Sequence, residues 1–183
     1  MVTAFNRRID GYANLDKPPE RQENTNELGM TEKDNAGVVA PPPLLYGGGL
    51  IVVLVLRWLQ PMPIFGPIVP LWPSLALAAL GVGIAIWGMR TLLAAGTNVN
   101  PSRPTTAIVH SGPYRFSRNP LYVALTLFYS GLTLALDTWW GFIALVPILV
   151  LMHCGVVLRE ERYLERKFGE NYRQYRSKVR RYL

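Results

Sequence analysis

The stretch 120-PLYVALTLFYSGLTLALDTWWGFIALVPILVLMHCGVVL-158 decides the fold class, because it carries a single charged residue, Asp137. Asp137 and Thr138 divide it into two apolar segments, at about 121–136 and 139–158. A bilayer core of about 30 Å takes roughly 20 helical residues, so each segment is a candidate transmembrane helix. With two residues between them, these helices are expected to form a tight antiparallel hairpin.

Two further candidate spans precede this stretch, at about 74–95 and 44–59. The first of the chain is the weakest, because it contains three consecutive glycines and Arg57. Arg57 is expected to snorkel to the outer interface, with a polar cavity as the alternative. Separate single spans cannot close a barrel, so the sequence predicts an all-α integral membrane protein with about four transmembrane helices.

The composition supports a membrane protein and argues against a soluble enzyme, a disordered chain or a disulfide scaffold. Half of the 183 residues are apolar and 17% are charged, whereas about 25% are charged in a typical soluble domain. The one cysteine, Cys154, has no partner within the chain for a disulfide.

The distribution of charge predicts an orientation. Residues 41–183 hold fourteen basic and five acidic residues, and nine of the basic ones follow Leu158. Basic residues beside apolar spans are typical of a cytosolic membrane face, and they attract anionic lipids rather than indicating nucleic-acid binding. The loop between the second and third spans is also basic. We therefore expect a multi-pass protein with that loop and both termini in the cytosol.

Residues 1–40 differ from the rest of the chain. They are rich in Asn, Glu, Asp and Lys and poor in aliphatic residues. Such a segment buries too little apolar surface to offset its ordering entropy, so it is predicted to be a mobile tail. Residues 41–183 form the predicted membrane domain, with a cytosolic tail at 159–183.

The loop at 96–120, GTNVNPSRPTTAIVHSGPYRFSRNP, is longer than a simple connection in a helical bundle requires. Its internal prolines keep it from being helical. Asn119 is a candidate N-cap, with Pro120 at the first helical position of the third span. The loop is either a binding element or an ordered cytosolic connection.

The cytosolic tail shows an apolar stripe at helical spacing, which predicts a C-terminal amphipathic helix interrupted at Gly169. The stripe consists of Val157, Leu164, Phe168, Tyr172, Tyr175 and Val179. Glu161 falls on this stripe, beside Glu160. A carboxylate there is costly unless a cation or hydrogen-bond donor meets it, and Arg118 or a ligand is a candidate. Alternatively, both glutamates pair with basic neighbours on their own helix.

No metal site and no catalytic residue is predicted from the residue types. Two histidines and one cysteine are too few for a structural zinc site. The chain has no Walker loop, no dinucleotide fingerprint and no readable nucleophile–base pair.

Three motifs carry a resemblance. The stretch SGPYRFSRNPLY (111–122) is followed by Glu160-Glu161 and by FGENYRQYRSKVRR (168–181). Their order resembles the isoprenylcysteine carboxyl methyltransferase family, which is similar in this region to membrane phospholipid N-methyltransferases. The match covers roughly residues 72–183.

The resemblance implies a membrane enzyme that uses S-adenosyl-L-methionine, held by a cytosolic loop, to methylate a membrane-embedded or amphipathic small molecule. The acceptor is a carboxylate, thiol or amine. The implied cofactor-binding residues lie in the loop, the Arg-Asn-Pro motif and the glutamate pair: Thr106, Ala107, Ile108, Val109, Tyr114, Arg118, Asn119, Pro120, Leu121, Tyr122, Glu160 and Glu161.

Two positions depart from the family pattern. Asn119 stands where the family has a histidine, and Asn does not titrate. Val156 and Val157 stand where eukaryotic isoprenylcysteine enzymes hold the substrate carboxylate with arginine, so isoprenylcysteine is not predicted as the substrate. The alternatives to a methyltransferase are a non-catalytic membrane scaffold and, less favoured, a nicotinamide-dependent membrane reductase.

Overall fold

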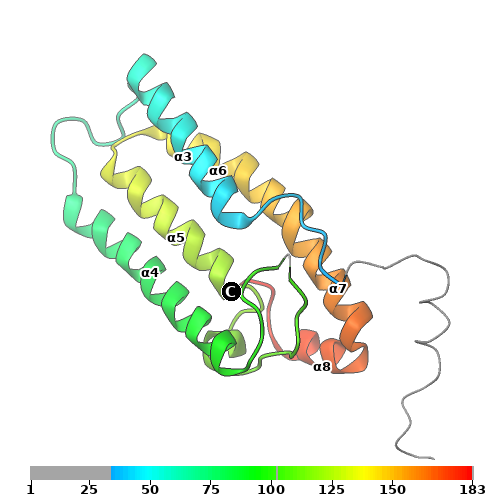
Figure 1. Ribbon diagram of the computed structural model, residues 1–183. Helices are drawn as coiled ribbons and strands as arrows, with labels where there is room; N and C mark the ends of the chain where they lie inside the picture. Colours follow the sequence, from blue (N-terminus) through cyan, green and yellow to red (C-terminus); the bar gives the residue numbers. More distant parts are fainter. Residues whose placement is uncertain (1–33, 102, 183) are drawn as a thin grey trace, which may run out of the picture. The chain divides into compact units, whose positions relative to one another are not determined.

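The computed structural model describes residues 34–101 and 103–182, and this part of the chain is helical without a β-strand (Figure 1). One isolated β-bridge joins Ser117 to Arg180. The all-α prediction is therefore confirmed for these residues. The helices are α3 (Pro42–Leu59), α4 (Leu71–Ala94), the 3-10 turn η2 (Gly112–Arg115), α5 (Pro120–Ala135), α6 (Trp139–Leu151), η3 (Met152–Val157), α7 (Leu158–Phe168) and α8 (Glu170–Lys178).

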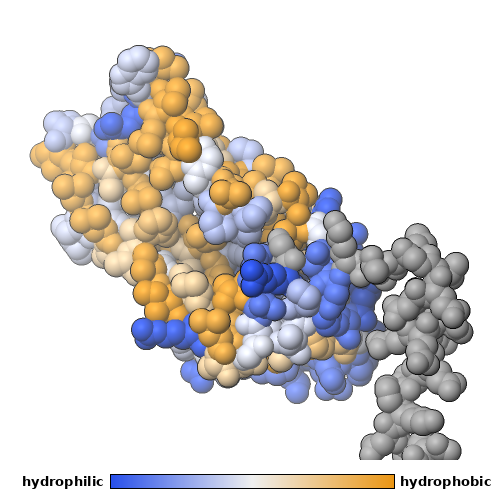
Figure 2. All heavy atoms as spheres, viewed as in Figure 1, coloured by the Kyte–Doolittle hydropathy of each residue, from blue (hydrophilic) through white to orange (hydrophobic). Residues whose placement is uncertain are grey.

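Three helices of the described residues are long and apolar enough to cross a membrane: Pro42–Leu59, Leu71–Ala94 and Trp139–Phe168. The predicted third span corresponds to α5, whose 16 residues extend only about 24 Å at 1.5 Å per residue. On the face shown in Figure 2, apolar side chains predominate over this helical part, and hydrophilic ones gather at the end formed by α7 and α8. Arg57 is exposed in the last turn of α3.

The closest packing of helix backbones is between α4 and α5, and glycine allows it. A Cβ atom added to Gly131 would lie 2.5 Å from the backbone nitrogen of Ala78, and one added to Gly81 would lie 2.6 Å from the carbonyl oxygen of Ala124. Side chains at these positions would separate the helices. The 3-10 turn η2 also packs against α4.

The predicted tight turn between the third and fourth spans is present, but its helices do not pack mainly on each other. Leu136 to Thr138 form the turn, with Asp137 at a φ of 50°. The Asp137 carboxylate accepts hydrogen bonds from the backbone N–H groups of Ile64 and Phe65, at 2.8 and 2.7 Å. These hydrogen bonds connect the α3–α4 loop to the turn. The helix α5 packs chiefly along α4, whereas α6 packs along α3 (Figure 1).

The helix that begins at Trp139 continues past the predicted span end at Leu158. The π-helical segment η3 joins α6 to α7 without a break, so one helix runs from Trp139 to Phe168. A π-turn adds a residue to the local register, and such turns are frequent at functional sites. The helix is interrupted at Gly169, as predicted, where φ is 54°. The next helix, α8, starts at Glu170.

The predicted N-terminal tail lies mostly outside the described residues, which begin at Asp34. Residues 34–40 lie along the helix from η3 to α7. The Asp34 carboxylate accepts hydrogen bonds from the Tyr163 hydroxyl at 2.8 Å and from the Lys167 amine at 2.6 Å. Hydrogen bonding to Lys167, then to Tyr163, lowers the pKa of Asp34 below its ordinary value of 3.8.

Candidate active site

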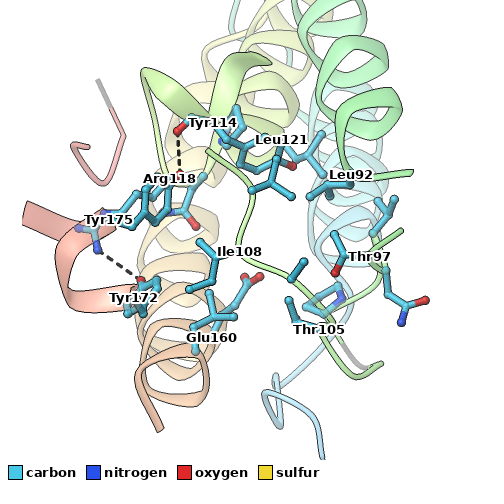
Figure 3. A pocket seen from close by; sticks show the side chains of 18 of the residues that line it. Leu92, Thr97, Thr105, Ile108, Tyr114, Arg118, Leu121, Glu160, Tyr172 and Tyr175 are labelled. Carbon is cyan, nitrogen blue, oxygen red and sulfur yellow. Dashed lines mark hydrogen bonds between the residues drawn. The ribbon is translucent and has the colours of Figure 1, made fainter. Parts of the chain in front are cut away.

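A pocket lies between the loop at 97–109, the end of α4, the start of α5, and α7 with α8; we call it the loop pocket (Figure 3). Glu160 and Tyr172 stand on one side of it, and Leu92 and Thr97 on the other. Ten of the twelve residues implied by the motifs line it: Ala107, Ile108, Val109, Tyr114, Arg118, Asn119, Pro120, Leu121, Tyr122 and Glu160.

The other two implied residues, Thr106 and Glu161, do not line the loop pocket. The Thr106 hydroxyl donates to the carbonyl of Gly96 at 2.9 Å, and its backbone N–H donates to the Thr97 hydroxyl at 3.1 Å. Thr106 therefore closes the loop on itself. Glu161 points instead into a cluster of arginines.

The Glu161 carboxylate is paired with two cations from distant parts of the chain. Arg118 Nη1 lies 3.0 Å from Glu161 Oε1, and Arg181 donates from Nε and Nη2 to the two oxygens at 2.9 Å each. The side chains of Arg118 and Glu161 are both 9% exposed. The expectation that Arg118 meets a carboxylate on the apolar stripe is confirmed, whereas the alternative of pairing within the helix is wrong for Glu161. Buried charges persist only when paired in this way.

The C-terminal segment holds the start of α5 in place. The backbone N–H of Arg118 donates to the Arg180 carbonyl at 2.9 Å, and Asn119 Nδ2 donates to the Arg181 carbonyl at 2.9 Å. Asn119 occupies the N-cap position before Pro120, as predicted, but its side chain makes no cap hydrogen bond. It joins two segments about sixty residues apart instead.

Glu160 makes a different contact from its neighbour. The Tyr122 hydroxyl donates to Glu160 Oε2 at 2.6 Å, and both residues line the loop pocket. Adjacent residues on a helix point about 100° apart, because the helix has 3.6 residues per turn. The two glutamates therefore have different contacts: Glu160 lines the pocket, and Glu161 pairs with Arg118 and Arg181.

Aromatic residues of α8 complete the wall, and sequence reasoning did not place them in the site. The Tyr175 hydroxyl donates to the Tyr114 carbonyl at 2.7 Å, and Arg118 Nη1 donates to the Tyr172 hydroxyl at 3.4 Å. Burial raises the pKa of Tyr114, Tyr172 and Tyr175. These phenols therefore stay protonated at neutral pH. The apolar stripe that includes Tyr172 and Tyr175 was the only signal for them.

Arg118, which lines the loop pocket, retains one unused donor. Its Nε is buried and has no hydrogen-bond partner among the described residues. An unpaired buried donor costs about 1–3 kcal/mol, more for a charged group. The lining of the loop pocket thus includes one basic residue, Arg118, and one acidic residue, Glu160. No group of metal-ligating side chains occurs in the described part of the chain.

A second cavity of about 550 Å³ lies between α5 and the helix α6–η3; we call it the apolar groove. Its walls are mostly aliphatic and aromatic side chains of these helices, with Tyr182 from the C-terminal segment. His153 Nδ1 and the Tyr182 hydroxyl are 2.8 Å apart in this groove. Tyr122 lines the groove as well as the loop pocket.

Comparison with known proteins identifies a family to which the chain is similar. Residues 69–171, more than half of the chain, match the model of the phospholipid methyltransferase family. An uncharacterised protein of Haemophilus influenzae is 36% identical over 63 residues, which are 34% of this chain and 100% of that protein. No solved structure matches the chain. The resemblance predicted from the motifs is thus confirmed: the chain is an integral membrane protein that belongs to the phospholipid methyltransferase family.

Proposed function

We propose that the protein is an S-adenosyl-L-methionine-dependent methyltransferase acting on a membrane-embedded or amphipathic small molecule. The observation that carries this proposal is the charge arrangement of the loop pocket. Its lining includes Arg118, whose buried Nε has no partner among the described residues, and the carboxyl-bearing Glu160. The methionine end of the cofactor carries the complementary pair of groups, a carboxylate and an amine.

The residues fit the cofactor as follows. Arg118 would hold the methionine carboxylate, and Glu160 Oε1 would accept from the methionine amine, since Oε2 already accepts from Tyr122. The adenosine would lie among Ile108, Tyr114 and Tyr175. When bound, S-adenosylmethionine supplies an electrophilic methyl group, and the chain's task is to align the acceptor with it at about 3–3.5 Å.

The loop pocket must widen to admit a ligand of this size. Its cavity measures about 90 Å³, whereas small-molecule pockets usually measure about 300–1,000 Å³. One wall consists of the irregular segments at 97–101 and 103–109 rather than of a helix. We infer that this loop moves outward on binding, while the helices keep the charged groups in place.

The proposed function includes a membrane topology. We infer four crossings, with the short α5 as the third, and with the loop, the C-terminal helices and both termini in the cytosol. The basic residues in and after α7 and α8 support this orientation. The acceptor then enters from the bilayer, and the cofactor from the cytosol.

Calorimetric titration of the detergent-solubilised full chain with S-adenosylhomocysteine, the expected product, tests the proposal. We expect micromolar binding that weakens by about tenfold in Glu160→Gln, since a hydrogen bond to a charged group contributes about 1.5–3 kcal/mol. Glu170→Gln is the matched control, because Glu170 pairs with Arg173 on the surface of α8. Absence of binding in folded protein would contradict the proposal and favour a non-catalytic membrane scaffold or a nicotinamide-dependent reductase.

A further inference from the structure

Residues 34–39 run along the helix from η3 to α7, beside the loop that walls the loop pocket; we call these residues the N-terminal strap (Figure 1). The Val39 N–H donates to the Gly155 carbonyl at 3.2 Å, and a Cβ atom added to Gly155 would lie only 3.2 Å from Val39 Cγ2. Further along the helix, Arg159 Nη1 donates to the Gly37 carbonyl at 2.9 Å. The strap is therefore held on the helix by its own backbone groups.

The strap also contacts the loop. The Ala36 N–H donates to the Pro101 carbonyl at 3.4 Å, and Ala36 is buried. A second contact runs through Tyr163 of α7, whose hydroxyl accepts from the Thr105 N–H at 3.1 Å and donates to Asp34 Oδ1 at 2.8 Å. Pro101 and Thr105 both line the loop pocket, and Figure 3 labels Thr105 there. The strap is thus connected to the irregular wall of the pocket at two points.

The Tyr163 hydroxyl is the point at which the strap, the loop and α7 meet. A phenol has one proton to donate, and this one goes to Asp34. The Tyr163 oxygen accepts from Thr105 and also from Lys167 Nζ, at 3.0 Å. The Lys167 amine donates in addition to the Asp34 carboxylate at 2.6 Å. Tyr163 is buried but does not line the loop pocket, so its hydroxyl joins these segments rather than facing a ligand there.

These contacts oppose opening of the loop pocket. Its cavity of about 90 Å³ must widen to admit a ligand of the proposed size. An outward movement of Pro101 and Thr105 breaks their hydrogen bonds to Ala36 and Tyr163, or else it pulls the strap away from the helix. Contacts that exist only in the closed form stabilise that form. A ligand that binds the open form then has an apparent affinity reduced by the fraction of the protein that is open.

We propose that the N-terminal strap is an autoinhibitory element, which holds the loop at 97–109 closed over the loop pocket through Tyr163. This inference rests on the proposed function, because S-adenosylhomocysteine is the ligand whose entry the strap opposes. Release begins at the pair of Asp34 and Lys167, whose side chains are 55% and 27% exposed. A competing ionic group in solution therefore has access to the contact that holds the first residue of the strap.

Calorimetric titration of two variants of the full chain with S-adenosylhomocysteine tests the inference. Asp34→Ala removes the exposed ion pair, and Tyr163→Phe removes the hydroxyl while it keeps the ring; neither residue lines the loop pocket. We expect binding to tighten about threefold in Asp34→Ala and about fivefold in Tyr163→Phe, since an exposed ion pair contributes less than a buried hydrogen bond.

Two control variants have the same chemistry elsewhere in the chain. Tyr129→Phe removes a hydroxyl that lies outside both cavities, and Glu170→Ala removes a carboxylate that pairs with Arg173 on the surface of α8. Both should bind like the wild type. Unchanged or weaker binding by Asp34→Ala overturns the inference, whether or not Tyr163→Phe folds.

Amide hydrogen exchange of the ligand-free chain gives a second readout, which does not depend on the identity of the ligand. Asp34→Ala and Tyr163→Phe should both accelerate exchange in residues 103–109 and leave α4 unchanged, because the loop opens more often while the helices stay packed. Faster exchange in the loop and in α4 together would indicate a general loss of stability and would overturn the inference.

The two proposals fail separately. If S-adenosylhomocysteine binds neither the wild type nor the variants, but exchange in residues 103–109 accelerates in both variants, the proposed function is wrong and the role of the strap is right. If S-adenosylhomocysteine binds the wild type and both variants equally, the proposed function stands and the strap is not autoinhibitory.

Discussion

Glu161→Gln is expected to destabilise the protein strongly, because it leaves the buried Arg118 without the carboxylate that neutralises its charge. Glu161 is held by Arg118 at 3.0 Å and by Arg181 at 2.9 Å, and the side chains of Glu161 and Arg118 are 9% exposed. Breaking a buried pair on one side costs about 3–5 kcal/mol. Gln keeps one acceptor oxygen, so we expect a cost near 3 kcal/mol.

Thermal unfolding in detergent measures this cost. For a chain of this length, 1 kcal/mol lowers Tm by about 2–4 °C, so Glu161→Gln should lower Tm by about 6–12 °C. The matched control is Glu165→Gln one turn further along α7. Glu165 pairs with Arg176 at 3.2 Å, and both side chains are more than a third exposed. Exposed pairs contribute about 0–1 kcal/mol, so the control should lose at most about 4 °C.

A double variant tests whether the cost of Glu161→Gln arises from the unpaired charge of Arg118 or from the altered packing of the side chain. If the cost comes from an unpaired guanidinium, Arg118→Met combined with Glu161→Gln should cost less than the sum of the single changes. Glu161→Gln should also weaken S-adenosylhomocysteine binding, because Glu161 positions the Arg118 side chain that borders the loop pocket. Equal Tm values for Glu161→Gln and Glu165→Gln would refute the reasoning.

Three further predictions follow from the packing, the pKa of Asp34 and the loop. Gly131→Ala should destabilise the α4–α5 contact by about 1–3 kcal/mol, whereas Gly83→Ala, with open space around its Cβ position, should be neutral in the same unfolding assay. The contact of Asp34 with Lys167 is fully present above the ordinary Asp pKa of 3.8 and is lost as pH falls below it, because the folded pKa is lowered. Limited proteolysis near residue 34 should therefore become faster below pH 3.8 and should not change between pH 5 and 7. Binding of S-adenosylhomocysteine should change amide hydrogen exchange in residues 97–109 more than in α4, and uniform change would argue against opening of the loop.

Much of the candidate site was predictable because its motifs are local in sequence. Pro120 begins a helix, Asn119 precedes it, and Gly169 ends one, since each effect depends on the dihedral preferences of one or two residues. Glu161 was predictable as a buried carboxylate, because helical periodicity alone places it on the apolar stripe. Its partnership with Arg118 followed as one candidate from the cost of an unpaired charge.

Other parts of the site carried no local signal. Arg181 is one of nine basic residues after Leu158, and nothing in its neighbourhood distinguishes it as the bidentate partner of Glu161. Thr97 and Leu92 reach the loop pocket because the end of α4 packs closely on the start of α5, where a Cβ atom added to Gly88 would lie 2.8 Å from Leu121 Cδ2. The third span was predicted to within one residue, but the helix that begins at Trp139 is longer than predicted, since it continues through η3 to Phe168.

The sequence by itself determined the helical class, the membrane setting and the position of the loop, because hydropathy, proline and glycine affect the backbone only within a few residues. The order of its motifs indicated the family. Only the tertiary structure decided which glutamate borders the loop pocket, which arginines pair with the other, and that Tyr122 stands between two cavities. These contacts join segments that lie tens of residues apart. These contacts form, and contribute to stability, only after the helices have packed, so no local sequence pattern predicts them.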